Sequence, residues 1–247
     1  MGIDIGVDLT AAVMIWVATT MLLAVTVQSI VGFGSALISA PFLIGLLGID
    51  VAIPLLSVLG ITQQIILWML YREGFNWQAM VRLTMASLVM VPVGILLVDY
   101  LPKHIVLTGL GLILIGYATY ELAQLQLPKL ASPRWGYLFG GAAGVLSGAY
   151  NIAGPPVILY ANCRRWEPDE FKSNLQGYFL INAVILVVSR ALQGQLTPNV
   201  WLLGLVALPA IAAGSLIGAR LSRWIEPQQF RKAVLVLLIV LGIRLML

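Results

Sequence analysis

Two glycine-rich segments carry the residues best suited to chemistry in this sequence. They are Gly32-Phe33-Gly34-Ser35-Ala36 and Asn151-Ile152-Ala153-Gly154-Pro155-Pro156. Each lies between two apolar stretches, so each is expected to end one helix and to begin another inside an apolar zone. A helix start presents unpaired N–H groups and a partial positive charge, and glycine lets the backbone approach a ligand closely. The two turns are therefore predicted to bind an anion without a buried Lys or Arg, through Gly34, Ser35, Ala36 and Gly154.

The two turns differ in how many donors they offer. Pro155 or Pro156 fits the first turn of a helix, where a missing N–H does no harm, but it also removes a donor. The second turn is therefore expected to present fewer N–H groups than the first. An alternative interpretation stays open, in which the glycines only let helices pack closely.

Polar side chains recur at helical spacing after each turn. One set follows i, i+3, i+7 spacing and the other i, i+4, i+8 spacing, so each is predicted to share one helix face and to line a central cavity. The sets are Ser57, Gly60 and Gln64, and Asn174, Tyr178 and Asn182. Gln28, Ser29, Ser147 and Asn151 lie near the turns and are expected to add donors. The competing interpretation is that these amides and hydroxyls only bridge helices.

Arg190 is the one cation predicted to reach an outer vestibule and attract anions, unless it only extends from a helix end toward water. All ten acidic residues fall in loops or at helix ends. A proton relay or Na⁺ site usually needs a carboxylate within the membrane. The inside-negative potential drives anion export at about 2.3 kcal/mol per charge per 100 mV. Potential-driven export is therefore the simplest mechanism, and the alternative is an importer of a sulfur-containing or carboxylate anion, coupled to protons or Na⁺.

No cofactor or metal site is expected, since the single Cys163 excludes a disulfide within the chain and a metal site built from cysteines. An intramembrane serine protease using Ser147 and His104 would need the two side chains within hydrogen-bond reach. Ser147 lies near a turn in one half of the chain, whereas His104 begins a helix in the other half. The sequence therefore disfavours this enzyme.

The composition defines the elements that must position these residues. The chain has 247 residues, of which 60% are hydrophobic and 10% charged, whereas soluble domains carry roughly 25% charged residues. Its mean hydropathy is +0.98. Stretches approaching the ~20 residues that cross a bilayer must be helical, because every buried backbone amide needs a partner. The fold is predicted to be an all-α polytopic membrane protein forming one domain over 1–247. Its apolar segments are 11–31, 35–48, 51–71, 79–99, 104–122, 135–150, 155–163, 173–190, 199–219 and 232–247.

Segments 35–48 and 155–163 are too short for ordinary crossings and are predicted to be half-helices of re-entrant hairpins. If the acidic N-terminus, with Asp4 and Asp8, is periplasmic and the segments alternate, eleven of the fourteen Lys and Arg residues lie inside. Basic residues collect in cytoplasmic loops, so this orientation is favoured. It also explains the net charge of +4 without a nucleic-acid partner.

The chain is predicted to contain an internal repeat. A shift of 120 positions superposes glycines and apolar residues, and loops matched by the shift differ in basic charge, as loops on opposite sides of a membrane would. The matched pairs include Gly34/Gly154, Gly74/Gly194, Gly94/Gly214 and Val25/Val145. We therefore expect two inverted repeats of about five segments, 11–122 and 135–247, joined by a linker at 123–134. Such repeats place a substrate site near the midplane between the halves.

The segments VQSIVGFGSALISAPFL and GVLSGAYNIAGPPVILY resemble the paired motifs of the sulfite exporter TauE/SafE family. That family has a glycine-rich turn followed by a proline in each of two repeats, and the resemblance covers nearly the whole chain. It implies transport of sulfite, sulfonates or related anions across the bacterial inner membrane. The chain departs from the family pattern at Ser35, Ala36 and Ala153, where consecutive glycines are frequent. The matching residues are Gly32, Gly34, Pro41, Gly148, Gly154, Pro155 and Pro156.

Overall fold

A computed structural model of the chain describes residues 10–123, 127–222, 224 and 227–246, and within them it contains helices and no strands. The predicted all-α fold is confirmed, with boundaries close to those expected. The N-terminus with Asp4 and Asp8, and residues 124–126 of the predicted linker, lie outside the described residues. The helices are α1 (Ala11–Val31), α2 (Ser35–Leu47), α3 (Ile49–Tyr71), α4 (Trp77–Tyr100), α5 (Lys103–Leu122), α6 (Trp135–Tyr150), α7 (Gly154–Arg164), α8 (Pro168–Leu192), α9 (Pro198–Leu221) and α10 (Pro227–Met246).

Helix boundaries follow local side-chain chemistry. The Thr10 hydroxyl accepts a hydrogen bond from the Val13 N–H at 3.4 Å, and Asn76 accepts one from the Ala79 N–H at 3.2 Å. These caps satisfy backbone donors that a helix start leaves unpaired. Helix α1 ends where Gly32 adopts a left-handed conformation with φ 94°, which glycine tolerates without strain.

The helices fit a membrane. Within the described residues, α1, α3, α4, α5, α8 and α9 are long and apolar enough to cross a bilayer. Large apolar side chains point outward, with Ile15 64%, Met69 60% and Leu205 62% exposed. Soluble monomers rarely expose apolar patches this extensive, so lipid is the natural solvent for this surface. Helices α2 and α7 have 13 and 11 residues, so at 1.5 Å per residue neither crosses a bilayer alone.

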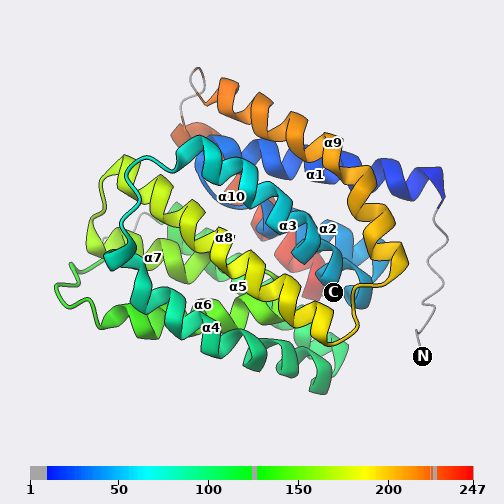
Figure 1. Ribbon diagram of the computed structural model, residues 1–247, viewed down its shortest axis with the longest axis horizontal. Helices are drawn as coiled ribbons and strands as arrows, with labels where there is room; N and C mark the ends of the chain where they lie inside the picture. The colour runs from blue at the N-terminus through cyan, green and yellow to red at the C-terminus, as the bar shows by residue number, and fades with distance from the viewer. Residues whose placement is uncertain (1–9, 124–126, 223, 225–226, 247) are drawn as a thin grey trace.

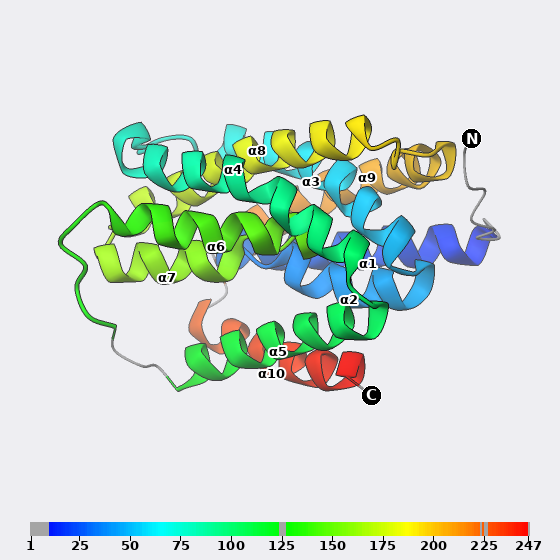
Figure 2. The same ribbon diagram turned by 90° about the horizontal axis from the view of Figure 1, so that it is seen from below.

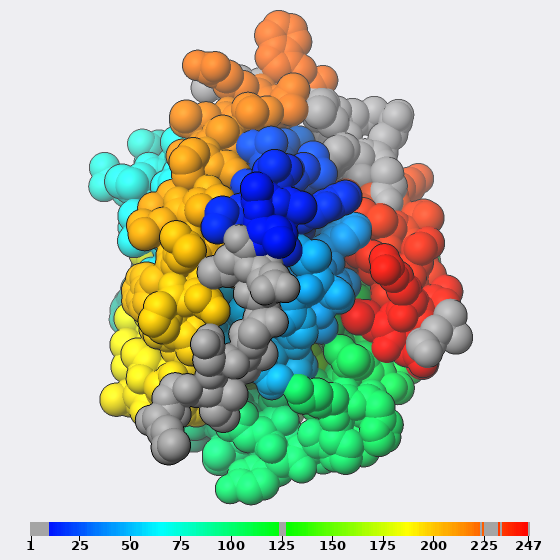
Figure 3. All heavy atoms as spheres, turned by 90° about the vertical axis from the view of Figure 1, so that its right-hand side faces the viewer, coloured from blue at the N-terminus to red at the C-terminus, as the bar shows by residue number. Residues whose placement is uncertain are grey.

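The two halves of the chain interleave. Helix α4 packs along α6, α1 along α9, α3 against α8 and α5 against α10, as Figures 1 and 2 show. In Figure 3, α1 and α2 from the start of the chain lie between α9 and α10 from its end. If each helix is replaced by its counterpart five helices away in the chain, the α4–α6 pair becomes the α9–α1 pair. The α3–α8 and α5–α10 pairs stay the same. The packing thus has the arrangement expected of a duplicated chain.

One pair of contacts supports the repeat at residue level. A Cβ atom on Gly94 would lie 2.1 Å from the Val145 carbonyl oxygen, so α4 and α6 touch through their backbones there. A Cβ atom on Gly214 would lie 3.3 Å from the Val25 Cβ, where α9 meets α1. Gly94 and Gly214 are 120 residues apart, as are Val25 and Val145. The same contact therefore occurs in both halves, and the opposite membrane orientation of the halves stays a prediction.

Candidate functional site

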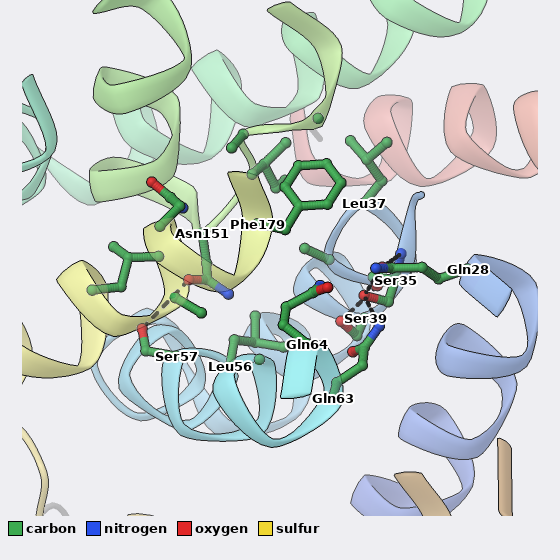
Figure 4. A pocket seen from close by; sticks show the side chains of 18 of the residues that line it. Gln28, Ser35, Leu37, Ser39, Leu56, Ser57, Gln63, Gln64, Asn151 and Phe179 are labelled. Atoms are coloured by element: carbon green, nitrogen blue, oxygen red, sulfur yellow. Dashed lines mark hydrogen bonds between the residues drawn. The ribbon is translucent and has the colours of Figure 1, made fainter. Parts of the chain in front are cut away.

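Both predicted turns border one cavity in the middle of the helix bundle (Figure 4). Its lining comes from α1, the start of α2, α3, the turn between α6 and α7, and α8. Neither turn is a surface loop, because Ser35, Ile152 and Ala153 are buried. The cavity volume is about 70 Å³. One water needs roughly 10–15 Å³ measured this way, so there is room for several waters or for one oxyanion of four heavy atoms.

The first turn is organised around the carboxamide of Gln28. The backbone N–H and the hydroxyl of Ser35 both donate to Gln28 Oε1, the N–H at 3.1 Å, and Gln63 Nε2 donates to the Ser35 hydroxyl at 2.9 Å. These bonds fix the amide with its oxygen toward α2. Gln28 lines the cavity, is only 3% exposed, and its Nε2 has no hydrogen-bond partner. The Gln28 side chain thus accepts the first N–H of α2 through its oxygen. Its NH₂ group remains as an unpaired donor at the cavity.

Further donors come from the start of α2 itself. Gly34, immediately before the helix, has φ 108°, a left-handed conformation that suits glycine. Ala36 and Leu37 line the cavity in the first turn, where helix geometry provides no intrahelical acceptor for the N–H groups. The partial positive charge of this helix start faces the cavity.

The second turn offers fewer backbone donors, as the sequence predicted. Asn151 ends α6 in a left-handed conformation with φ 59°, and its N–H bonds to the Ser147 carbonyl at 2.8 Å. Pro155 and Pro156 fill the first turn of α7 and have no N–H. Among the first three residues of α7, Gly154 is the one that has an N–H group. The Asn151 side chain lines the cavity and accepts a hydrogen bond from the Ser57 hydroxyl at 3.4 Å.

The two polar sets behave differently. Ser57, Gly60 and Gln64 all line the cavity, whereas only Asn182 of the second set does. Spacing alone does not separate the two sets, because the first spans about 60° around its helix and the second about 80°. Asn174 instead accepts a hydrogen bond from the Asn76 N–H at 2.8 Å, and the Tyr178 hydroxyl lies 2.5 Å from that of Ser87. Asn174 and Tyr178 thus connect α8 to neighbouring segments.

Arg190 is placed neither in a vestibule nor at the lipid surface. It is 2% exposed, and it donates to the Gly148 carbonyl at 2.6 Å and to Gln195 Oε1 at 2.7 Å. Gly148 belongs to the last turn of α6, where carbonyls lack intrahelical partners and a cation is favourable. Arg190 is one turn beyond the lining residue Leu186 and does not line the cavity. It therefore stabilises the end of α6 that precedes the second turn.

Replacing Arg190 by methionine should lower the stability of the protein by about 1–3 kcal/mol, because the buried Gly148 carbonyl loses its donor. Arg190→Lys should recover part of this loss, since an ammonium group keeps the charge but cannot reach both acceptors as the planar guanidinium does. The check is the Tm of purified protein in detergent. A methionine variant as stable as the wild type would show that this bond contributes nothing.

Sequence reasoning missed three buried polar residues near the turns. Gln63 and Ser39 line the cavity, and Gln63 holds Ser35 in place. Gln176, 1% exposed, donates to the Gly32 carbonyl at 2.7 Å and so supports the first turn from α8. A glutamine buried among apolar helices costs free energy unless it is hydrogen-bonded. That cost was the signal in the sequence that marks Gln63 and Gln176.

The enzymatic alternative finds no support in the geometry. The Ser147 hydroxyl accepts a hydrogen bond from Asn182 Nδ2, and His104 is exposed at the beginning of α5. Within the described residues no group of three His, Cys, Asp or Glu side chains is close enough to hold a metal ion.

Comparison with known proteins identifies the family. A family model described as "Sulfite exporter TauE/SafE" matches residues 17–245. The "Probable sulfite/organosulfonate exporter TauE" of Cupriavidus necator is 27% identical over 180 residues, covering 71% of this chain and 70% of the relative. The "Probable inner membrane transporter protein TsaS" of Comamonas testosteroni is 31% identical over 175 residues, covering 69% and 72%. No solved structure matches the chain.

The family match includes both turns and every lining helix of the cavity. Transporters of this kind bind their substrates between helices. The chain is a transmembrane transporter rather than an enzyme, and it belongs to the sulfite exporter TauE/SafE family.

Proposed function

We propose that this protein exports a small anion, sulfite or an organosulfonate, across the bacterial inner membrane through the cavity between the two turns. The observation that carries the proposal is the meeting of two helix starts at one cavity within the bundle, where polar side chains interrupt an apolar lining. Helix starts attract anions, and a low dielectric strengthens that attraction. The printed names of the two relatives, a sulfite/organosulfonate exporter and an inner membrane transporter, agree with this substrate class and location.

The proposed substrate contacts are the predicted residues that line the cavity. They divide into backbone groups at the helix starts and side chains on the facing helices. Asn174, Tyr178 and Arg190 act in this proposal by holding α8 and α6 in position. The contacts are Gln28, Gly34, Ser35, Ala36, Ser57, Gln64, Asn151, Gly154 and Asn182.

Export follows from the membrane potential in this proposal. With a periplasmic N-terminus and inverted halves, the first turn lies toward the cytoplasm and the second toward the periplasm. An anion then leaves down the inside-negative potential without a coupling ion, at about 2.3 kcal/mol per charge per 100 mV. Import against that potential would require a coupled proton or Na⁺.

Anion flux in proteoliposomes tests the mechanism. Methanesulfonate is the probe, because its single charge does not change with pH. Its flux should accelerate with a voltage that is negative on the side of origin, and should not respond to an imposed pH or Na⁺ gradient at fixed voltage. Flux that requires one of those gradients and ignores voltage would contradict export driven by potential and would support the coupled importer.

A further inference from the structure

The lining of the cavity carries no charge. All of its residues among those described are neutral, including Gln28, Gln64, Asn151 and Asn182. The titratable and charged side chains on the helices that border the cavity lie elsewhere on them; they are Asp50, Tyr71, Tyr137, Tyr150, Tyr160, Cys163, Arg164, Asp169, Glu170, Lys172, Tyr178 and Arg190. The cost of removing an ion from water rises with the square of its charge, so a dianion loses about four times as much hydration free energy as a monoanion. Neutral donors are better matched to a single negative charge.

The cavity also contains acceptors that an anion alone cannot satisfy. Gln64 Oε1 and Asn182 Oδ1 belong to lining side chains that are 7% and 6% exposed, and neither atom has a hydrogen-bond partner. Asn182 Nδ2 donates to the Ser147 hydroxyl, and in this orientation Oδ1 is left without a donor. A buried acceptor without a donor is costly, and a negatively charged oxygen beside it makes the cost larger. Gln28 Nε2, in contrast, is an unpaired donor bordering the same space.

These two observations define a ligand with oxygen acceptors for Gln28 and the start of α2, and with a hydrogen for Gln64 or Asn182. We propose that the cavity binds a singly charged, hydrogen-bearing oxyanion, so that sulfite is transported as hydrogen sulfite and not as the dianion. This inference rests on the proposed function and specifies the ionic form of its substrate. Hydrogen sulfite in its O–H form supplies one charge, several acceptors and one donor.

The pH dependence of transport tests this inference. Sulfite and methanesulfonate efflux are compared at low concentration and equal pH on both sides of the liposome. Hydrogen sulfite loses its proton near neutral pH, so sulfite efflux should fall from about pH 6 to about pH 8, approaching tenfold per pH unit at the upper end. Methanesulfonate efflux, which reports any titration of the protein, should stay level. Sulfite efflux that holds or rises with pH while methanesulfonate stays level would overturn the inference.

One variant tests the Gln64 acceptor by itself and leaves the other lining residues unchanged. Gln64→Met keeps the length of the side chain and removes Oε1. At the acidic end of the range it should slow sulfite efflux by about tenfold, the loss of one hydrogen bond to a charged ligand. It should slow methanesulfonate efflux by clearly less than sulfite efflux, because that anion loses only its contact with the Gln64 NH₂ group and has no hydrogen to donate to Oε1. Gln193→Met, at an exposed position outside the cavity, is the matched control and should change neither rate.

The outcomes distinguish this inference from the proposed function. If Gln64→Met slows both anions equally, Gln64 does not accept a hydrogen from the substrate and the inference fails while export stands. If neither anion moves in the wild-type protein at any pH, the proposed function itself fails.

Discussion

Replacing Gly94 by alanine should destabilise the protein severely, by about 3 kcal/mol or more. The new Cβ atom would lie 2.1 Å from the Val145 carbonyl oxygen and 2.9 Å from the Val145 carbonyl carbon. Both are backbone atoms of α6, so no side-chain rotation relieves the contact, and α4 must move away from α6. We expect a large drop in Tm and a low yield of folded protein, measured in detergent by thermal unfolding and size-exclusion chromatography.

Gly141→Ala is the matched control for this prediction. Gly141 lies in α6, the partner helix, and a Cβ atom there would meet only the Met90 Cγ, at an ordinary 3.7 Å. Alanine also favours helix over glycine by about 1 kcal/mol, so this variant should be as stable as the wild type or slightly more stable. A Gly94→Ala protein with a wild-type Tm would contradict the close approach of the two backbones.

The repeat makes the same experiment informative in the other half of the chain. A Cβ atom on Gly214 would lie 2.7 Å from the Leu22 carbonyl oxygen, a close but less severe contact with α1. The glycines that match at a shift of 120 residues therefore serve helix packing at 94 and 214, while those at 34 and 154 border the cavity. An added Cβ atom at 34 or 154 would meet no backbone of another helix within 4 Å, and anion binding by these two glycines stays a prediction.

The sequence predicted the parts of the site that depend on local backbone chemistry. The closely spaced glycines at 32 and 34 favour a helix end, and the prolines at 155 and 156 favour a helix start, so both turns were located correctly. Ser57, Gly60 and Gln64 were assigned to the right face because i, i+3, i+7 positions stay within a narrow arc.

Contacts between distant segments were beyond the reach of sequence patterns. The rotation of α8 depends on where Ser87 and Asn76 lie, and those residues take Tyr178 and Asn174 away from the cavity. Arg190 was predicted to reach an outer vestibule and attract anions, but it donates to the Gly148 carbonyl and to Gln195 Oε1, and no side-chain pattern marks the first of these. Gln63 was overlooked because its role requires Ser35, 28 residues earlier, to lie beside it.

Replacing Gly154 by leucine should abolish transport and leave the protein folded. Gly154 lines the cavity, and a Cβ atom there would meet only the Ile158 Cδ1 at 3.8 Å, so the new side chain has room to extend. Four added carbon atoms would occupy much of a cavity of about 70 Å³ and cover the free N–H of the second turn. We expect methanesulfonate and sulfite efflux to fall by about a hundredfold or more, equivalent to about 2.7 kcal/mol, with a Tm close to that of the wild type.

Gly154 is a better position for this experiment than Gly34. Gly34 has φ 108°, where any side chain strains the backbone, so loss of transport in a Gly34 variant would not separate blockage from misfolding. Gly154 has no positive φ, so leucine there avoids the strain expected at Gly34, and the Tm reports the cost of placing a side chain before Pro155. Gly45→Leu is the matched control, because Gly45 is an exposed position on α2 with no atom within 4 Å of an added Cβ. The contradicting outcome is a folded Gly154→Leu protein that transports as fast as both the wild type and Gly45→Leu. The anion would then cross by a route that avoids the space between the two helix starts.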